Sequence, residues 1–165
     1  MIELTEEPYD GEVALRLVDR LRIELNERYA DHAEADDPDD DDYLAEVTPE
    51  RVRRPLGAFV VAWLDGEAVG CGALKPLDHN PVHAEIKRMY TLPGARRRGV
   101  SRTLLGRLEV IAVELGYAWI QLETGLAQPE AIALYETHGW HRIMPYGHYR
   151  HSPMSVCFAK DLAAR

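Results

Sequence analysis

The spacing of apolar positions changes several times along the chain, and each change marks an expected element. Helical spacing predicts helices over residues 11–29, 100–115 and 129–138. Runs rich in valine, aromatic and other apolar residues predict strands. The expected strands span residues 2–7, 57–64, 68–77, 82–91, 119–123, 140–143 and 155–159. Elements in this order predict a mixed α/β sheet with helices packed on its faces.

Alternation within the strand expected over residues 82–91 divides its side chains between two faces. Glu85, Lys87 and Met89 fall on one face, and the side chains at positions 86, 88 and 90 fall on the other. The alternation therefore predicts that Lys87 and Arg88 point to opposite sides of the sheet.

Length and composition indicate one domain. With 165 residues, the chain suits a single domain over residues 1–165, and it shows no internal repeat. No apolar run approaches the length of a membrane span, and the N-terminus lacks the pattern of a signal peptide. Cys71 and Cys157 lie in apolar stretches without metal or redox spacing, which indicates buried free thiols. We therefore expect a cytoplasmic protein without a membrane partner.

The negative charge of the chain is concentrated in one segment. The formal net charge is −9, and residues 31–42 contain eight Asp or Glu residues but no Lys or Arg. So many adjacent like charges predict a loop, within residues 30–45, rather than a packed element. The rest of the chain is close to neutral, so it lacks the broad basic face of a nucleic-acid-binding protein. The segment is either a solvated loop or a means of attracting a cationic substrate such as a polyamine.

A cluster of positive charge precedes the second expected helix. Arg96, Arg97 and Arg98 are followed by Gly99 and the helix expected from residue 100. A helix N-terminus offers unpaired backbone N–H groups and the positive end of the helix dipole. Guanidinium groups add charge-assisted donors whose geometry matches phosphate oxygens. The segment predicts a phosphate site, and its alternative is a solvated basic surface.

Residues 85–140 resemble the GNAT superfamily of N-acetyltransferases. These proteins carry a loop of the form Q/R-x-x-G-x-G/A after their fourth strand, and Arg96, Gly99 and Ser101 stand at its defined places. Downstream, residues 128–140 are similar to the superfamily's N-x-x-A-x-x-L-Y-x-x-x-G-F/Y segment. Two residues depart from these patterns: a serine replaces Gly or Ala, and a glutamine replaces Asn. The resemblance implies a mixed, mostly antiparallel sheet of six to seven strands with helices on both faces.

The resemblance also implies that acetyl-CoA is the co-substrate, and the spacing of the residues gives no reason to expect a metal. The pyrophosphate would lie on backbone N–H groups of residues 97–102, and the pantetheine arm would pair with residues 89–91 as an added strand. A bulge in the fourth strand would leave a backbone N–H near Met89 for the thioester carbonyl. The implied cofactor-binding residues are Met89, Tyr90, Thr91, Arg96, Arg97, Arg98, Gly99, Val100, Ser101, Arg102, Gln128, Ala131 and Tyr135. Histidine pairs within residues 138–151 have ligand-like spacing, but nothing places them on one metal centre.

Three residues are candidates for proton transfer. In the histone-modifying branch of the superfamily, a glutamate lies eleven residues before the loop motif, and Glu85 has this spacing. Glu123, at the end of the next strand, is the competing base; in that case Glu85 would simply pair with Lys87 or Arg88. Tyr135 matches the tyrosine that protonates the departing thiolate, and its alternative is a place in the core.

These resemblances imply transfer of an acetyl group from acetyl-CoA to a primary amine of a small molecule or peptide, by direct attack in a ternary complex. The alternative is an acyl-CoA-binding regulatory module without turnover. The acceptor is not defined, because the acidic segment suits a cationic amine, whereas Arg53 and Arg54 suit the carboxylate of an amino-acid-like acceptor. Members of the superfamily commonly dimerise, but no feature of this sequence decides between a monomer and a homodimer.

Overall fold

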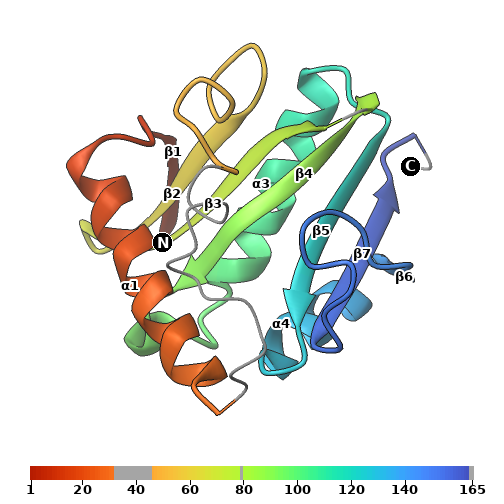
Figure 1. The fold of residues 1–165 in the computed structure, drawn as a ribbon. Helices are drawn as coiled ribbons and strands as arrows, with labels where there is room; N and C mark the ends of the chain where they lie inside the picture. Colours follow the sequence, from red (N-terminus) through yellow and green to blue (C-terminus); the bar gives the residue numbers. More distant parts are fainter. Residues whose placement is uncertain (32–45, 79, 164–165) are drawn as a thin grey trace.

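The computed structural model describes residues 1–31, 46–78 and 80–163, which form a seven-stranded sheet with helices on both faces (Figure 1). The strands are β1 (Ile2–Glu6), β2 (Ala58–Leu64), β3 (Glu67–Leu77), β4 (Asn80–Thr91), β5 (Trp119–Gly125), β6 (His141–Ile143) and β7 (Ser155–Asp161). The helices are α1 (Glu12–Tyr29), α3 (Val100–Glu114) and α4 (Pro129–Thr137), with a 3-10 turn, η1 (Pro93–Ala95), before α3. The expected elements are present with bounds shifted by a few residues. Most of the acidic segment, expected to be a loop, lies outside the described residues.

The strands lie in the order β1-β2-β3-β4-β5-β7-β6. Every neighbouring pair is antiparallel except β4 and β5, which are parallel. A parallel pair needs a crossover connection, and α3 supplies it between these two strands. The mixed, mostly antiparallel sheet is therefore confirmed.

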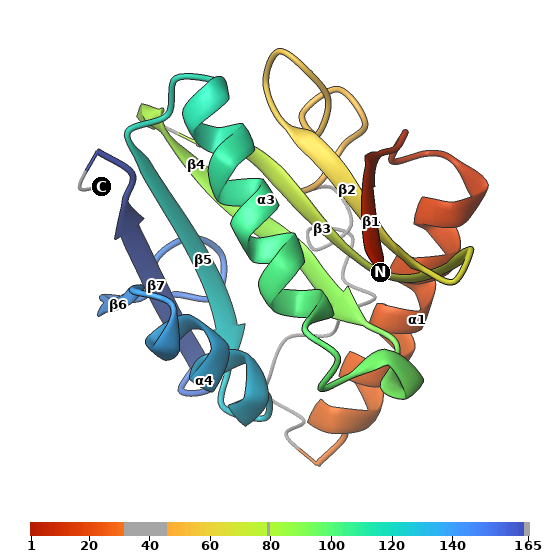
Figure 2. The same cartoon turned by 180° about the vertical axis from the view of Figure 1, so that it is seen from behind.

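An apolar core lies on each face of the sheet. Figures 1 and 2 show α1 on one face, and α3 and α4 on the other. The core on the α3 face includes Ile86, Leu104, Leu105, Leu108, Ile111 and Leu122. The core on the α1 face includes Ala14, Leu17, Leu21, Phe59, Val61 and Cys71. Helix α3 thus buries the apolar stripe from which it was predicted, whereas α1 buries Leu17 and Leu21 and leaves Leu15 and Ile23 of its expected apolar positions exposed. None of the helices in the described ranges combines the length and apolar character that a membrane span requires.

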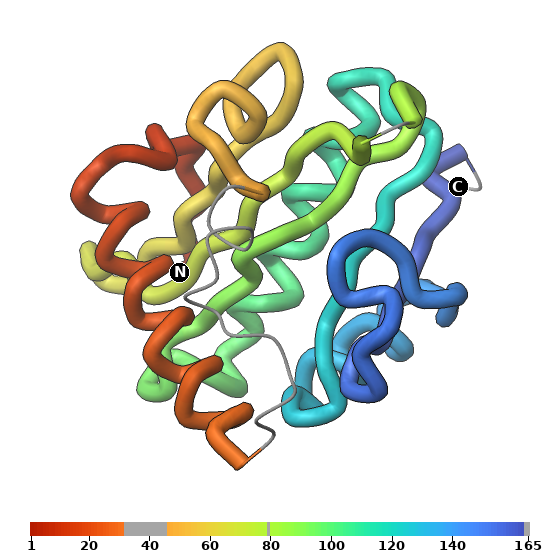
Figure 3. The backbone as a smooth tube through the Cα atoms, in the orientation of Figure 1, coloured from red at the N-terminus to blue at the C-terminus, as the bar shows by residue number. Residues whose placement is uncertain are grey.

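Strands β4 and β5 are paired over only part of their length. The paired residues run from His83 opposite Trp119 to Ile86 opposite Leu122. Beyond Ile86 the two strands diverge, and their far ends lie well apart (Figure 1). Figure 3 shows the chain between β6 and β7 passing over the face of β5 that α1 leaves uncovered. The divergence therefore leaves one edge of β4 open beside a partly covered face of the sheet.

Strand β4 contains an extra residue relative to β3. Cys71 of β3 lies opposite Tyr90, but Ala73, two residues on, lies opposite Lys87, three residues back. Arg88, inside this shift, has a φ of 58°, in the left-handed region that non-glycine residues rarely adopt. This is a β-bulge, which disrupts the two-residue alternation of the strand.

The bulge reverses which face each later side chain of β4 occupies. Ile86 packs in the core on the α3 face, but Tyr90 packs in the core on the α1 face. Met89 packs against the core on the α3 face, whereas Lys87 lies opposite Ala73, a residue of the core on the α1 face. The strict alternation predicted for residues 82–91 is therefore wrong beyond Lys87, because one inserted residue moves every following side chain to the other face.

Candidate active site

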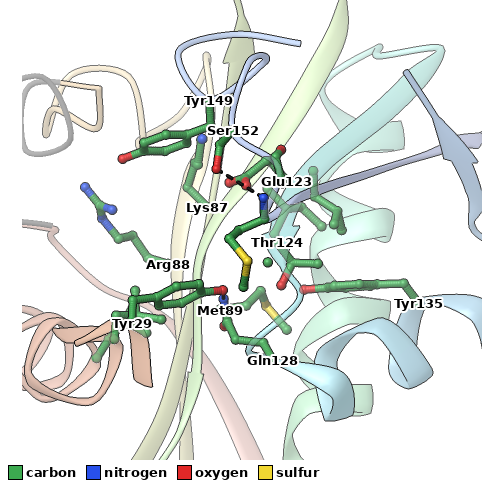
Figure 4. Close-up of a pocket in the computed structure, with 17 residues that line it drawn as sticks. Tyr29, Lys87, Arg88, Met89, Glu123, Thr124, Gln128, Tyr135, Tyr149 and Ser152 are labelled. Atoms are coloured by element: carbon green, nitrogen blue, oxygen red, sulfur yellow. Dashed lines mark hydrogen bonds between the residues drawn. The ribbon is translucent and has the colours of Figure 1, made fainter. Parts of the chain in front are cut away.

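A cavity opens where β4 and β5 diverge. Its walls come from α1, β4, β5, the first turns of α4 and the segment between β6 and β7. Figure 4 shows Glu123 and Tyr135 among the side chains that line it. The lining residues therefore include two of the three candidates for proton transfer, and Glu85 lies outside this lining.

The expected phosphate loop enters α3 through left-handed backbone. Gly99 is the N-cap residue with a φ of 87°, and Arg97 has a φ of 62°. Glycine adopts this conformation without strain, which explains its place at the turn. Among the residues that the structure describes, no side chain caps the N-terminus of α3. The first backbone N–H groups of the helix are thus arranged as a phosphate site requires.

The three arginines have different surroundings. Arg96 donates from Nε to the Thr91 carbonyl oxygen over 3.1 Å, and its guanidinium pairs with Glu24 of α1. Arg97 and Arg98 are exposed, and the Arg98 guanidinium lies 3.8 Å from an Asp65 carboxylate oxygen. Arg96 therefore fixes α1 against the loop, while the two arginines after it extend toward solvent.

Two further motif positions take part in local contacts. The Ser101 hydroxyl lies 3.0 Å from that of Thr91, so the serine at this place links the helix start to the end of β4. Gln128 lines the cavity and donates from Nε2 to the Tyr29 hydroxyl over 3.3 Å. Ala131, one turn into α4, packs against the core. Of these three motif residues, Ser101 joins α3 to β4, Gln128 contributes to the wall of the cavity, and Ala131 packs in the core.

Tyr29, at the end of α1, is a cavity residue that motif analysis missed. A Cβ on Gly125 would lie 1.8 Å from its hydroxyl oxygen, so the glycine makes room for this ring. Burial raises the pKa of Tyr29, so the hydroxyl stays protonated at neutral pH. The signal was present in the sequence, because Leu21, Leu25 and Tyr29 share one helical face and all line the cavity.

Glu85 belongs to a buried cluster of charges. Its side chain pairs with Lys75 at 2.9 Å and with Lys87 at 3.1 Å, and the Tyr146 hydroxyl donates to it over 2.9 Å. Burial alone would raise the pKa of Glu85, but the charges of Lys87 and Lys75 and these hydrogen bonds outweigh burial and lower it. Pairing with Lys87, one of the two roles open in the sequence, is thus present in the structure.

Glu123 carries the same carboxyl group as Glu85, but its surroundings differ. Its side chain lines the cavity, and burial raises its pKa to about 7, against an ordinary value of 4.5. The charge of Lys87 and a hydrogen bond with Ser155 oppose this rise without cancelling it. A carboxyl group with a pKa near neutrality exchanges protons readily at physiological pH.

Tyr135 is both a core residue and a cavity residue. Its ring packs 5.8 Å from Trp140 and 5.5 Å from Phe158, measured between ring centroids, and only 4% of the residue is exposed. It also lines the cavity together with Glu123. Burial, followed by the charge of Glu123, raises the pKa of Tyr135, so the phenol holds its proton at neutral pH. A place in the core is therefore compatible with the other role expected for Tyr135, which is to donate a proton in the cavity.

The comparisons with known proteins agree with this geometry. A model of the Acetyltransferase (GNAT) family matches residues 18–140. The chain belongs to this family. The IAA acetyltransferase of Azospirillum brasilense is 35% identical over 131 residues, which is 74% of this chain and 85% of that protein. The protein is thus an acetyltransferase of the GNAT type.

Solved structures share the fold over nearly the whole chain. A protein from Klebsiella pneumoniae assigned to the acyl-CoA N-acyltransferases superposes with a TM-score of 0.78 at 27% identity, covering 98% of both chains. A GNAT family acetyltransferase from Elizabethkingia anophelis, solved with acetyl-CoA bound, gives a TM-score of 0.66 at 16% identity and covers 97% of both chains. At 16% identity, the likeness to the E. anophelis protein shows a shared fold only.

Three further cavity residues belong to neither of the two sequence motifs. Tyr149 and Ser152 belong to the segment between β6 and β7, and Arg88 reaches the cavity through the bulge. The histidines of residues 138–151 do not come together as ligands: within the described ranges, no three His, Cys, Asp or Glu side chains are grouped so that they could hold a metal ion.

The raised pKa of Glu123 predicts how stability depends on pH. The folded protein binds this proton more tightly than the unfolded chain, so the ionised carboxylate reduces stability increasingly between pH 4.5 and 7. Glu123→Gln should therefore become more stable relative to the parent as pH rises from 5 to 8, by up to about 3 kcal/mol. Urea unfolding at several pH values measures this difference.

The matched change Glu85→Gln should act in the opposite direction at pH 8, since it removes the buried carboxylate that pairs with both Lys75 and Lys87. A pH-independent effect of Glu123→Gln would contradict the expected ionisation of Glu123 in the folded protein.

Proposed function

We propose that this enzyme transfers the acetyl group of acetyl-CoA to a primary amine of a small molecule or peptide, by direct attack in a ternary complex. The observation that carries the proposal is the placement of Glu123 and Tyr135 in one cavity, at the point where β4 and β5 diverge. A base and an acid beside an open strand edge are the groups that aminolysis of a thioester requires.

The described residues suit acetyl-CoA as co-substrate. The uncapped start of α3 and the exposed Arg97, Arg98 and Arg102 would hold the pyrophosphate. The backbone of residues 89–91 would pair with the amide groups of the pantetheine arm, because β5 does not pair with this part of β4. Val100 and Gly99 would bring the helix backbone close to the phosphates. The E. anophelis neighbour, which shares this fold, was solved with acetyl-CoA bound, and this supports acetyl-CoA as the co-substrate.

Glu123 is the better candidate for the base. It lines the cavity and its pKa is about 7, so it would be partly ionised at neutral pH and would accept the proton of an incoming ammonium. Glu85 is ion-paired with two lysines and its pKa is lowered, so it is a weaker base. Its role would be to hold Lys87 and Tyr146 in place at the edge of the cavity.

Two groups would stabilise the charge that develops on the substrate. The bulge turns the backbone at Met89 away from regular pairing, and its N–H would donate to the thioester carbonyl oxygen; such a donor contributes roughly 3 kcal/mol to the transition state. Tyr135, whose raised pKa keeps it protonated, would give its proton to the departing thiolate.

Direct attack is favoured over a thiol-linked intermediate. Neither Cys71 nor Cys157 lines the cavity. Burial raises the pKa of Cys71 to about 12 and also raises that of Cys157. A thiol acts as a nucleophile through its thiolate, and these environments disfavour the thiolate.

The reaction itself is the first test. With acetyl-CoA and a panel of primary amines, the protein should release free CoA thiol and form the matching N-acetylated amine. A thiol reagent measures the released CoA, and mass spectrometry identifies the acetylated amine. The control omits the amine, and release should then stay at the background rate. Binding of acetyl-CoA without thiol release from any amine would contradict the proposal and would instead fit an acyl-CoA-binding regulatory module.

The pH dependence identifies the base. Because only the carboxylate form of Glu123 accepts a proton, kcat/KM should rise with pH and level off above an apparent pKa near 7. Glu123→Gln should abolish this limb and lower kcat by about 10²- to 10⁴-fold. Glu85→Gln, the matched variant, should keep the limb. Loss of the limb in Glu85→Gln and its retention in Glu123→Gln would assign the base to Glu85.

Removal of one hydroxyl tests the acid. Tyr135→Phe should lower kcat by roughly 10²-fold and leave the Kd of acetyl-CoA nearly unchanged, because the ring still packs on Trp140 and Phe158. Steady-state kinetics and calorimetric titration give the two quantities, and the unchanged thermal midpoint is the control. A kcat equal to that of the parent would remove Tyr135 from the acid role.

A further inference from the structure

Two residues of opposite charge follow the last pair between β4 and β5. That pair is Ile86 opposite Leu122, and Lys87 and Glu123 are the next residues of the two strands. Both side chains line the cavity, and Figure 4 shows them extending into the same part of it, toward the segment between β6 and β7. The register of the strands thus brings an ammonium group to the candidate base.

Two other carboxylates fix the position of the Lys87 ammonium. Its Nζ lies 2.8 Å from a Glu46 oxygen and 3.1 Å from a Glu85 oxygen, and the side chain is 11% exposed. Glu85 is also paired with Lys75 of β3 at 2.9 Å. Charges therefore alternate from Lys75 through Glu85 and Lys87 to Glu46, and Glu123 faces this chain of charges at Lys87.

The Lys87 ammonium acts on Glu123 with only part of its charge, because two carboxylates share it. Burial raises the pKa of Glu123 most, the charge of Lys87 opposes this rise, and the charges of Glu46 and Glu85 add to it. Full pairing with Lys87 would make Glu123 a weak base, as Glu85 is. Without the ammonium, the Glu123 carboxyl group would stay protonated at neutral pH and could not accept a proton.

Other titratable groups that face Glu123 hold their protons at neutral pH, because burial raises the pKa of each. They are Tyr29 of α1, Tyr135 of α4, Tyr146 of the segment between β6 and β7, and Cys157 of β7. Arg88 lines the cavity too, but Figure 4 shows its side chain extending toward α1, away from Glu123. The cation that stabilises the Glu123 carboxylate is therefore Lys87.

We infer that Lys87 is a positioning residue for acetyl transfer, and that its ammonium stabilises the Glu123 carboxylate that accepts the proton of the amine. Glu46 limits this effect, because it pairs with the same ammonium. The inference rests on the proposed function, in which Glu123 is the base, and it adds the residues that set the charge of that base. Lys87 acts through Glu123 and requires no contact with the substrate.

The experiment measures the ionisation of Glu123 with and without these charges. Carbon NMR of the glutamate carboxyl groups follows it without any substrate, and the loss of one signal in Glu123→Gln identifies the residue. Lys87→Met removes the charge and keeps a long side chain, so the apparent pKa of Glu123 should rise by about one unit. Glu46→Gln should lower this pKa, because it removes one of the two carboxylates that share the Lys87 ammonium.

Enzyme kinetics should show the same displacements. In Lys87→Met, the rising limb of kcat/KM should move to higher pH by about one unit, so that kcat/KM falls about fivefold at pH 7 and recovers above about pH 9. In Glu46→Gln, the limb should move to lower pH. Structural damage to the site would lower kcat/KM at every pH, and it would not displace the limb in opposite directions in the two variants.

Further variants separate the charge of Lys87 from its packing. Lys87→Arg keeps a cation and should leave the limb near its position in the parent, whereas Lys87→Gln should move it in the same direction as Lys87→Met. Lys75→Met removes an equal charge from the same cluster, but Lys75 lies on β3, one strand farther from Glu123, so the limb should move much less. Without Lys87, Glu85 keeps its ion pair with Lys75 and its hydrogen bond from Tyr146, so the neutral variants should fold.

The outcomes distinguish this inference from the proposed function. An unchanged pKa of Glu123 in both neutral variants of Lys87, or displacement in the same direction by Lys87→Met and Glu46→Gln, would overturn the inference and leave amine acetylation standing. Retention of the limb in Glu123→Gln would also overturn it, because another group would then be the base. Absence of thiol release with every amine would overturn the proposed function, and the inference with it.

Discussion

Strand β4 must pair with β3 along its length and still present an open edge to the cavity, and the extra residue at Arg88 reconciles these two demands. The parallel pairing with β5 ends at Ile86, just before the bulge. If β4 continued as a regular strand, β5 could follow it and close the cavity. The left-handed backbone at Arg88 is thus the point on which the shape of the site depends. The fold supports it through Gly72, where a Cβ would lie 2.7 Å from the Met89 sulfur.

Two glutamates on neighbouring strands show how surroundings set the chemistry of one side chain. Glu85 is buried and Glu123 is half-buried, and burial acts on the pKa of both in the same direction. Two lysines and a tyrosine hydroxyl stabilise the charge of Glu85, so its pKa falls. Glu123 has weaker compensation, so its pKa rises to about 7. In a medium of low dielectric constant, the positions of a few cations separate a permanent anion from a titrating group.

Periodicity predicted the elements and the mixed sheet, because these depend on residues close together in the chain. The face of each side chain beyond Lys87 was not predictable in this way, since a single inserted residue leaves the apolar pattern of β4 almost unchanged. The difference between the surroundings of Glu85 and those of Glu123 was equally out of reach. It depends on Lys75 and on Tyr146, which lies 61 positions from Glu85 in the sequence. Long-range electrostatics of this kind leave no local signal.

The hydrogen bond from Tyr146 to Glu85 has a consequence for how such an enzyme can diversify. It fastens the segment between β6 and β7 to β4 at a point outside the cavity lining, while Tyr149 and Ser152 of the same segment face the cavity. Residues after this hydrogen bond can change without disturbing the strands that carry the candidate bases. Anchor and contact surface are thus separate parts of one loop, which lets substrate preference evolve while the chemistry is kept.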